Sequence, residues 1–428
     1  MTEMADAEKR KGVDVVATLE PDASPAGLAR RRHGLGFWLA GYVFAITIAF
    51  SAVPAPLYVL YQARDHFGPP LVTIIFSVYA LGVAASLFGV GHVSDWLGRR
   101  RILLLAVATN MASGVAFLFW PAVPGLIIGR ILSGVSIGML TATATAYLSE
   151  LDAAGHGGLA RRRAEITATA ANLGGLGFGP LVAGFLAQYV ADPLQVPYLV
   201  FEALMLIGLA VLALVPETVP RPPARPAYRP QRVSVPADQR PLFFAAGAAA
   251  AAGFALLGLF TSLAPGFIAG TLHDPSHALA GAATFAVCGA AAVAQVVLAR
   301  ASLRRQLAIG MGVLVLGLVL ITAAVWAASL ALLLAGGVLA GSGVGALFKG
   351  SVSTVLGIAP PGVRGETLAG LFLAAYLGLA VPVVALGVAT ELLSVRTAVS
   401  GFAAVLAAAV ALVSRPLLRR SAGATHPG

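Results

Sequence analysis

The amino-acid sequence predicts an all-α polytopic membrane protein, with twelve transmembrane helices in two six-helix bundles related by a parallel pseudo-repeat. Three observations predict this fold class. The 428 residues are 58% hydrophobic and only 11% charged, with a mean hydropathy of +0.88. Apolar runs of about 18 residues or more recur along the whole chain, as membrane-spanning helices require. One long polar segment, residues 217–241, divides these runs into six and six.

Each apolar run is expected to form a helix, because backbone groups in lipid must be hydrogen-bonded within their own segment. The alternating strands of roughly ten residues that mark a membrane β-barrel do not occur in the sequence. The first bundle, residues 36–216, is predicted to have spans at 36–62, 71–93, 102–122, 124–149, 165–190 and 196–216. The second bundle, residues 242–418, is predicted to have spans at 242–270, 278–299, 306–327, 330–357, 366–390 and 395–416.

The basic residues predict the orientation, because cytosolic loops of membrane proteins are enriched in Lys and Arg. With the N-terminus in the cytosol, 24 of the 28 Lys and Arg fall in cytosolic segments, and only Arg64 and Arg396 fall in outer loops. The even number of spans then places both tails, residues 1–35 and 419–428, in the cytosol. This distribution accounts for the net charge of +10 without a nucleic-acid partner.

The segment 217–241 is rich in Pro and Arg, so we expect a cytosolic linker and not a packed domain. The bundles on either side of it resemble each other weakly. GRILSGVSIGML at 129–140 aligns with GGVLAGSGVGAL at 336–347, and an Arg-x-Glu triplet follows each of them. A parallel repeat of six-helix halves is typical of a transporter whose substrate site lies at the midplane, between the halves.

The stretch GHVSDWLGRRR, residues 91–101, joins the second and third spans on the predicted cytosolic side. Its glycines permit close helix approach, and Asp95 can be neutralised by arginines or by a helix N-terminus. Arginines alone would serve equally as positive-inside anchors, but the added Gly and Asp spacing indicates a latch between the two halves. The predicted latch residues are Gly91, Asp95, Gly98, Arg99, Arg100, Arg101 and Glu150.

This stretch resembles the loop signature of the major facilitator superfamily, G-x-x-x-D-[RK]-x-G-[RK]-[RK]-[RK], except that Trp96 replaces a basic residue. In the fourth span, Arg130 followed by Gly134 and Gly138 resembles that family's R-x-x-x-G pattern. The PET sequence at 216–218 resembles the family's usual ending of span 6. The resemblance covers residues 36–418, and it implies the major facilitator fold, alternating access and a monomer.

A further resemblance lies in the fifth span, where NLGGLGFGPLVAG at 172–184 is similar to the antiporter-type helix motif of the same family. The matching residues are Gly175, Gly179, Pro180, Ala183 and Gly184, and Ile166 stands where the motif has a more distant glycine. Within the family this motif is associated with drug–proton exchangers. Ordinary packing of small residues between helices is the alternative interpretation.

Few titratable groups fall within the predicted spans. Glu202 and Arg130 lie at similar depth in the first bundle, near the outer ends of spans 6 and 4. We hypothesise that Glu202 carries the exchanged proton and that Arg130 tunes it, since a nearby guanidinium alters how readily a buried carboxylate ionises. A static pair, or a Glu202 that reaches the outer interface, is the alternative.

The resemblance implies that spans 1, 4, 7 and 10 line the substrate cavity. Lys349 in span 10 would then meet an anionic substrate, or it would reach the cytosolic headgroups instead. The cavity lining is expected to be mostly apolar, with a few polar and aromatic groups. The candidates are Tyr58, Tyr79, Asn110, Thr141, Asn172, Phe254, Gln295 and Tyr376.

The sequence therefore predicts a secondary active transporter that exports small lipophilic compounds or drugs in exchange for protons, without a cofactor or metal. A facilitator or importer of a small metabolite is the alternative, and a non-transporting receptor would need a larger soluble domain. No cluster of His, Asp or Glu occurs at one interface, so an enzyme is not expected. The excess of Arg over Lys and the abundance of Ala are typical of GC-rich bacteria, which places the protein in an inner membrane.

Overall fold

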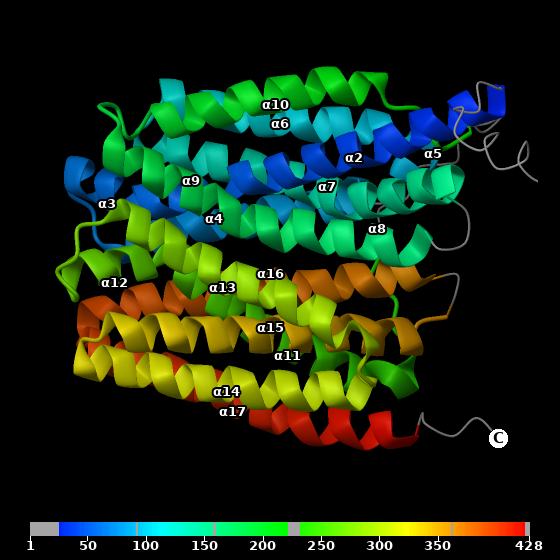
Figure 1. Ribbon diagram of the computed structural model, residues 1–428. Coiled ribbons are helices and arrows are strands. Elements are labelled where there is room, and N and C mark those ends of the chain that lie inside the picture. Colours follow the sequence, from blue (N-terminus) through cyan, green and yellow to red (C-terminus); the bar gives the residue numbers. More distant parts are fainter. Residues whose placement is uncertain (1–24, 91–92, 157–159, 221–231, 361–362, 424–428) are drawn as a thin grey trace, which may run out of the picture.

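The computed structural model describes residues 25–90, 93–156, 160–220, 232–360 and 363–423. Its long helices lie side by side in a single layered bundle (Figure 1). Twelve of the helical segments are long and apolar enough to cross a membrane, from 32–65 at the start of the bundle to 395–419 at its end. The twelve predicted spans are therefore confirmed in number and order.

The first half contains six spans. Their helices are α2 (Pro25–Ala52) with α3 (Pro54–Asp65), α4 (Pro69–Val90), α6 (Arg99–Phe119), α7 (Val123–His156), α8 (Ala160–Thr169) with η2 (Ala170–Gly174) and α9 (Gly175–Tyr189), and α10 (Val196–Leu214). The short helix α5 (Ser94–Leu97) lies between the second and third spans.

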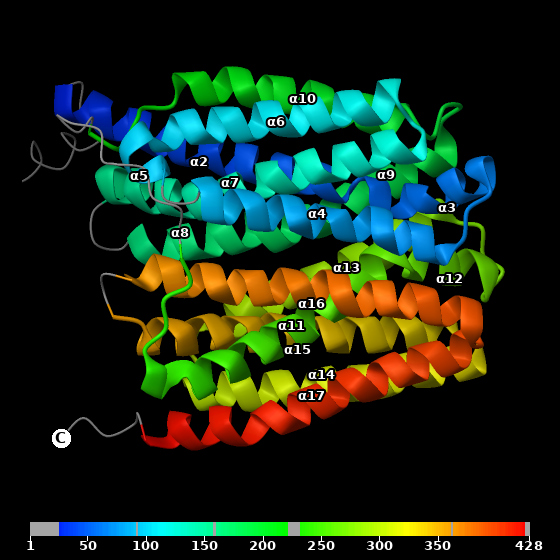
Figure 2. The same cartoon turned by 180° about the vertical axis from the view of Figure 1, so that it is seen from behind.

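The second half follows the same plan. Its helices are α11 (Arg240–Ser262) with α12 (Ala264–Gly270), α13 (His277–Val297), α14 (Leu303–Ala327), α15 (Leu330–Ile358), α16 (Arg364–Leu392) and α17 (Val395–Gly423). The single 3-10 turn η3 (Ala237–Gln239) directly precedes α11, and the single 3-10 turn η4 (Leu298–Arg300) directly follows α13. We call the end where α2 begins and α17 ends the terminal end, and the opposite end the distal end (Figure 2).

The first span of each half is broken near its distal end, where the sequence predicts one continuous helix. In the first half the break falls at Val53, directly before Pro54, and in the second half it falls at Leu263, two residues before Pro265. Proline cannot donate a backbone hydrogen bond, and it clashes with the preceding helical turn. Because each break falls in the first span of its half, the two breaks support the parallel repeat that the sequence indicates.

Two hydrophobic cores underlie the two halves. One core runs from Phe37 to Val215 and the other from Leu242 to Leu417. Leu379 and Val383 of α16 pack into the core of the first half, so the halves are joined by buried side chains. The principal contacts across this boundary are those of α9 with α13 and of α4 with α16. A site between the halves is therefore framed by these four helices and by the broken spans.

Candidate functional site

A small pocket of about 30 Å³ lies between the two halves, and we call it the central pocket. The first half contributes most of its lining and the second half closes it. Its residues are Ser51, Ala52, Ala55, Tyr58, Phe76, Tyr79, Arg130 and Leu176 from the first half, with Leu257, Thr261 and Leu379 from the second. The break between α2 and α3 brings Ser51, Ala52 and Ala55 to this place.

Arg130 is the charged residue of the central pocket, and its exposed fraction is only 3%. Its Nη1 donates a hydrogen bond of 2.6 Å to the carbonyl oxygen of Ser51, in the last turn of α2. The carbonyls of a last helical turn have no partner within the helix, so Arg130 satisfies one of them. The guanidinium lies 4.5 Å from the ring centroid of Tyr79 and 5.3 Å from that of Phe76. Such cation–π contacts partly compensate a desolvated charge.

The predicted pairing of Arg130 with Glu202 is not found. Within the described part of the chain the two make no ion pair, and Arg130 is directed to Ser51 instead. Glu202 is half-buried on α10, and its Oε1 is buried without a hydrogen-bond partner. This carboxylate packs against Gly114 of α6, where an added Cβ would overlap Oε1 of Glu202 and would lie 2.9 Å from the ring of Phe50. The sequence places Arg130 and Glu202 at a similar depth in the membrane, but depth does not determine the direction in which each side chain leaves its helix.

A chain of aromatic rings connects the central pocket with the second half. Tyr79 meets Tyr376 across the boundary, with ring centroids 6.1 Å apart. Tyr376 lies 5.6 Å from Phe254, Phe254 lies 5.1 Å from Phe348, and Phe348 lies 5.9 Å from Phe372. The sequence singled out Tyr79, Phe254 and Tyr376, and the structure adds the two remaining rings. Together they give the middle of the molecule an apolar, polarisable wall.

The other predicted cavity residues are placed unevenly. Asn110 is fully buried, and its Nδ2 donates to the carbonyl oxygen of Thr47 at 2.9 Å, so it braces α2 against α6 and is not a cavity residue. Thr141 returns its hydroxyl to Ile137 at 2.9 Å. Asn172 lies in the π-helical turn η2, where the extra residue in the turn changes the direction of the following side chains.

Lys349 and Gln295 lie in the second half. Lys349 is half-buried on α15, next to Phe348 in the sequence, and Gln295 is half-buried on α13. Neither lines the central pocket in this conformation. Lys349 nevertheless places a positive charge on α15, the span of the second half that corresponds in the repeat to α7, which carries Arg130.

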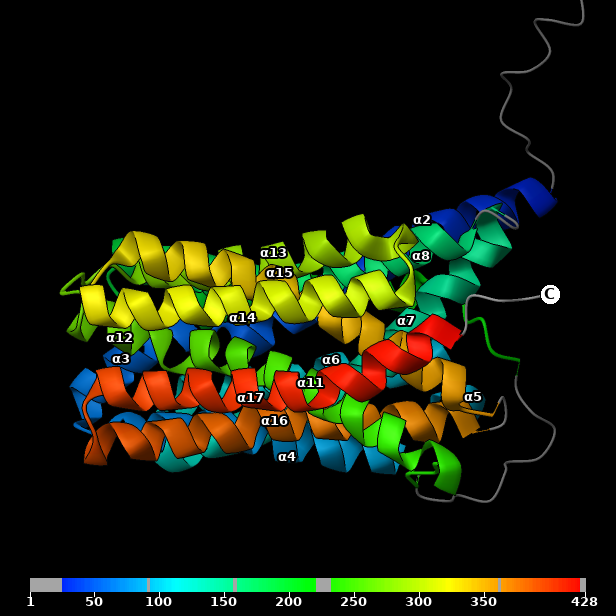
Figure 3. The same ribbon diagram turned by 90° about the horizontal axis from the view of Figure 1, so that it is seen from below.

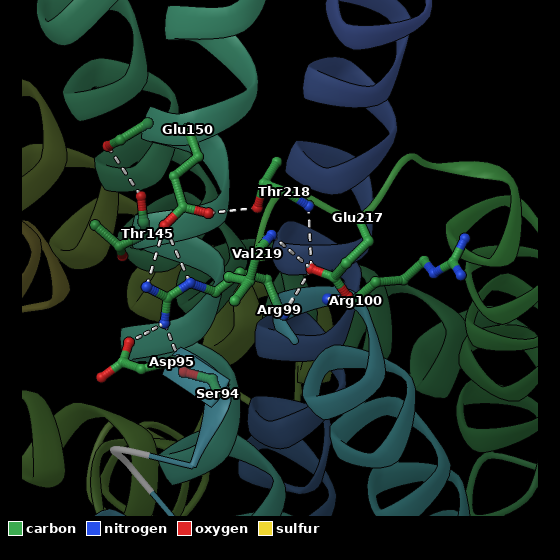
Figure 4. Close-up of polar contacts among 10 residues, drawn as sticks. Ser94, Asp95, Arg99, Arg100, Thr145, Glu150, Glu217, Thr218 and Val219 are labelled. Carbon is green, nitrogen blue, oxygen red and sulfur yellow. Dashed lines mark hydrogen bonds and ion pairs between the residues drawn. The ribbon is translucent and has the colours of Figure 1, made fainter. Parts of the chain in front are cut away.

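The predicted latch is centred on Arg99 (Figure 4). Its Nη1 lies 2.5 Å from Oδ1 of Asp95 and 2.7 Å from Oγ of Ser94, and its Nη2 lies 3.1 Å from Oε1 of Glu150. These contacts join α5, α6 and α7, which all belong to the first half. In this conformation the cluster clamps the terminal end of the first half and does not bridge the two halves, so a latch that forms in another conformation stays a prediction.

Glu217 completes this cluster, and the sequence analysis did not select it. Its carboxylate accepts backbone hydrogen bonds from Arg99 at 2.9 Å and from Arg100 at 3.2 Å, at the N-terminus of α6. An acidic group there caps free N–H groups and complements the helix dipole. Gly98 has a positive φ of 106°, and a Cβ on it would lie 2.5 Å from Oε2 of Glu217. The PET sequence was the signal that would have identified this residue.

The remaining residues near the latch have separate roles. Thr218 donates to Glu150, and the hydroxyl of Tyr147 donates to the carbonyl oxygen of Pro216 at 2.5 Å. The side chain of Arg101 is exposed. Asp152, two residues after Glu150 on α7, is fully buried, and its Oδ1 lies 3.7 Å from Nη1 of Arg163. The predicted latch residue Gly91 lies outside the described residues.

The glycines of the antiporter-type helix motif lie at tight helix contacts. A Cβ at Gly175 would lie 2.7 Å from the carbonyl oxygen of Ala45, and one at Gly179 would overlap the carbonyl oxygen of Ala49. Both of these contacts are with α2. At the distal end, Gly184 packs against the backbone of His277, at the start of α13. The motif thus places α9 between a span of its own half and a span of the other half.

Pro180 belongs to the same contact, since its carbonyl oxygen lies against Gly281 of α13. Within the described residues, no group of three or more His, Cys, Asp or Glu is arranged to hold a metal ion. The features that the structure gathers between the halves are therefore a buried guanidinium, aromatic rings and closely packed glycines.

Sequence comparison identifies relatives in several transport families. Residues 34–322 match the Major Facilitator Superfamily. The chain is 29% identical over 177 residues to the multidrug efflux pump LfrA of Mycolicibacterium smegmatis, which covers 38% of this chain and 34% of that one. It is 29% identical over 138 residues to the galactose-proton symporter of Escherichia coli K12, which covers 31% of this chain and 28% of that one. The chain thus spans about a third of the length of either relative.

Solved structures share the fold over nearly the whole length. The human organic anion transporter MFSD10 covers 90% of this chain and 99% of its own, with a TM-score of 0.64 and 18% identity. A bacterial homologue of the human lysosomal transporter Spinster, in an inward-facing and unoccupied conformation, covers 91% of this chain and 98% of its own, with a TM-score of 0.69 and 14% identity. The protein therefore belongs to the major facilitator superfamily, and it has the multi-pass helical fold that these solved structures share.

Proposed function

We propose that this protein is a proton-coupled exporter of small lipophilic compounds, neutral or anionic, that works by alternating access. The observation that carries the proposal is the buried guanidinium of Arg130 among aromatic rings in the central pocket. A buried charge is costly unless a partner offsets it. An anionic substrate would supply that partner, a neutral one would leave the cation–π contacts intact, and a cationic one would add repulsion.

The polar groups of the central pocket favour a lipophilic substrate over a sugar. The hydroxyl of Ser51 donates to Ile48 at 2.7 Å, and that of Thr261 donates to Leu257 at 2.8 Å. Unused hydrogen-bonding capacity remains at Oη of Tyr58 and Nε of Arg130. A sugar needs partners for many hydroxyl groups, and this pocket offers few. Import of a small metabolite stays the second candidate, because a galactose-proton symporter is among the relatives.

The contacts between the halves support alternating access. Close approaches lie toward the distal end, where Gly184 meets His277 and Gly387 meets Thr73. Toward the terminal end, Thr145 on α7 is exposed although its helix lies inside the bundle. We infer a conformation that opens toward the terminal end. We place that end in the cytosol of a bacterium, with both termini there, and we propose that the transporter acts as a monomer in the inner membrane.

Glu202 is the group that we propose to carry the proton. Its Oε1 is buried and has no hydrogen-bond partner among the described residues, so no hydrogen bond to this oxygen favours the ionised carboxylate. It acts without the guanidinium of Arg130, because the two side chains are not paired. A proton taken up at Glu202 would remove an uncompensated buried charge, which couples protonation to the packing of α10 against α6.

The test uses proteoliposomes with an imposed pH gradient and a set of neutral, anionic and cationic lipophilic dyes of similar size. Wild type is expected to accumulate neutral or anionic dyes against their own gradient, and a protonophore should abolish this. Glu202→Gln should lose accumulation but keep downhill movement, whereas Asp192→Asn, an exposed carboxylate before the same helix, should behave as wild type. Accumulation by Glu202→Gln would exclude its proton role. If no dye responds in wild type, the export proposal fails.

A further inference from the structure

A second and much larger pocket of about 580 Å³ lies at the distal end, and we call it the distal pocket. It is bounded by α3 and α4 of the first half and by α11, α12 and the ends of α14 to α17 of the second half, and it lies apart from the close contact of α9 with α13. The two short helices α3 and α12 lie next to each other at this end (Figure 3). The distal pocket shares no lining residue with the central pocket, and its volume lies within the range of about 300–1,000 Å³ found for small-molecule sites.

The lining of the distal pocket is apolar. Its walls include Leu259, Phe260, Phe267, Ile321 and Leu386, and none of the described residues that line it is charged. A charged ligand entering it would lose its hydrating water without gaining a charged partner, which is strongly unfavourable. The chemistry of the walls therefore selects an uncharged lipophilic ligand.

Three of the four polar side chains among the residues that line the distal pocket are hydrogen-bonded within the protein, and Thr271 is the fourth. Ser262 donates to Gly258 at 2.6 Å, Thr390 donates to Gly387 at 2.7 Å, and Gln62 donates to Phe67 at 3.3 Å. Gln62 and Thr390 lie in the last turns of α3 and α16, at the distal ends of those helices. Polar groups thus gather at the rim while apolar groups form the interior. This arrangement suits a molecule that exchanges with the aqueous phase at the distal side, and not a lipid chain that enters from the bilayer.

Two glycines on α12 show that the space in the distal pocket is accessible to added atoms. Gly266 and Gly270 both line it, and a Cβ built on either one meets no heavy atom within 4 Å. Residues four apart share one face of a helix, so the face of α12 that lines the distal pocket has no side chain at these two positions. Most other glycines of the bundle instead lie against a neighbouring helix, as Gly184 and Gly387 do.

We propose that the distal pocket binds one compact uncharged lipophilic molecule, which contacts both halves of the transporter at once. Its walls come from both halves, so it exists in this form only while α3 and α4 lie against α11 and α12. A ligand that binds one conformation better than the other shifts the equilibrium toward it. The occupant would therefore hold the distal ends together and slow transport. This inference does not depend on the identity of the transported substrate.

The experiment is photolabelling of the full-length protein with benzophenone in proteoliposomes without a pH gradient. Diphenylmethane, which has a similar shape and is not photoreactive, serves as the competitor. Adducts are located by mass spectrometry of peptides. Wild type is expected to show saturable labelling on α12 and α16 that diphenylmethane displaces. Gly266→Trp, which places a large side chain in the open space, should weaken this labelling by about tenfold or more.

Two further variants keep the test decisive. Gly270→Leu fills the same space with a smaller side chain and should also weaken labelling, in case Gly266→Trp does not fold. Gly401→Trp is the matched control, since its Cβ also meets no atom within 4 Å but it lies on the exposed face of α17, away from the pocket. Labelling that rises linearly with benzophenone and is equal in all variants would mean lipid partition only and would overturn the proposal. The result is independent of dye export, because binding is read without transport.

Discussion

At the scale of single residues, Arg130 makes a hydrogen bond and a cation–π contact with different parts of its guanidinium group. Nη1 holds the carbonyl oxygen of Ser51, while the face of the guanidinium lies over Tyr79. Nε remains without a hydrogen-bond partner. A planar guanidinium can serve both purposes at once, because its N–H groups donate in the plane while its face stacks on the ring.

Replacing Arg130 by Gln should remove the positive charge of the central pocket. We expect KM for anionic dyes to rise by about tenfold or more, with little change for neutral dyes of the same size. Arg130→Lys should restore part of the anion preference, because it keeps the charge. Initial rates of uptake at several dye concentrations measure this. Arg396→Gln, an exposed residue at the distal end, is the control. Equal losses for neutral and anionic dyes would argue against a charge contact.

The sequence identified the residues of the motifs, but it did not identify most of the contacts that their side chains make. Arg99 and Glu150 were both selected, and they form an ion pair of 3.1 Å. The direction of a side chain depends on helix rotation and on neighbouring helices, which apolar runs do not encode. Asn110 and Glu202 therefore had the right span and depth but a different environment from the one expected. Glu217 lay in a recognised triplet, yet its capping role becomes visible only with α6 beside it.

At the scale of elements, α9 determines how closely the halves approach. Its glycines face α2 in their own half and α13 in the other, so one helix is packed tightly on two sides. Small residues allow backbones to approach closely, which in a membrane is a main source of helix association. Any change of conformation must let α9 slide or tilt on α13 without opening a gap between them.

Gly184→Leu should separate α9 from α13, because the new side chain would overlap the backbone of His277 and Gly281. Overpacking of this kind typically costs about 1–3 kcal/mol, so we expect lower thermal stability together with a large loss of transport. Gly312→Leu is the control, since its Cβ on the exposed face of α14 meets no atom within 4 Å. Melting curves and dye uptake are measured for both. Wild-type uptake by Gly184→Leu would show that this contact is not needed.

The elements themselves were largely predictable. The number and order of the spans follow from apolar runs, because lipid enforces helices of a minimum length. The breaks at Val53 and Leu263 were missed although Pro54, Pro56 and Pro265 are plain in the sequence. Proline is tolerated within many membrane helices, so its presence alone does not indicate a break. The π-helical turn η2 likewise carries no signal in the sequence alone.

At the scale of the whole molecule, the two halves have separate cores but share a buried boundary. Leu379 and Val383 belong to the core of the first half although they lie on α16. The weak repeat in the sequence and the paired breaks in the structure describe the same pseudo-symmetry. The size and lining of the spaces between the halves could not be predicted, since they depend on how two bundles meet and not on either bundle.

A single substitution should permit a covalent link between the halves. The Cβ of Cys288 on α13 would lie 3.0 Å from a Cβ at Gly177 on α9, slightly closer than the spacing of about 3.8 Å typical of a disulfide. Gly177→Cys oxidised with copper phenanthroline should stop dye uptake, and a thiol reductant should restore it. Mass spectrometry of the linked peptides verifies the bond. Gly177→Ser under the same treatment is the control, and full transport by the oxidised form would contradict movement at this boundary.

The contact between Arg130 and Ser51 couples the binding of a charged substrate in the central pocket to the first broken span. The carbonyl oxygen of Ser51 lies two residues before the break at Val53 that separates α3 from α2, so the guanidinium acts as a brace beside a hinge. A carboxylate bound in the pocket would compete with this oxygen for the same donors. Loading the transporter would then release the brace and loosen α3, whose residues also form one wall of the distal pocket. Binding of a substrate in the central pocket would thereby change the position of α3, and through α3 the shape of the distal pocket.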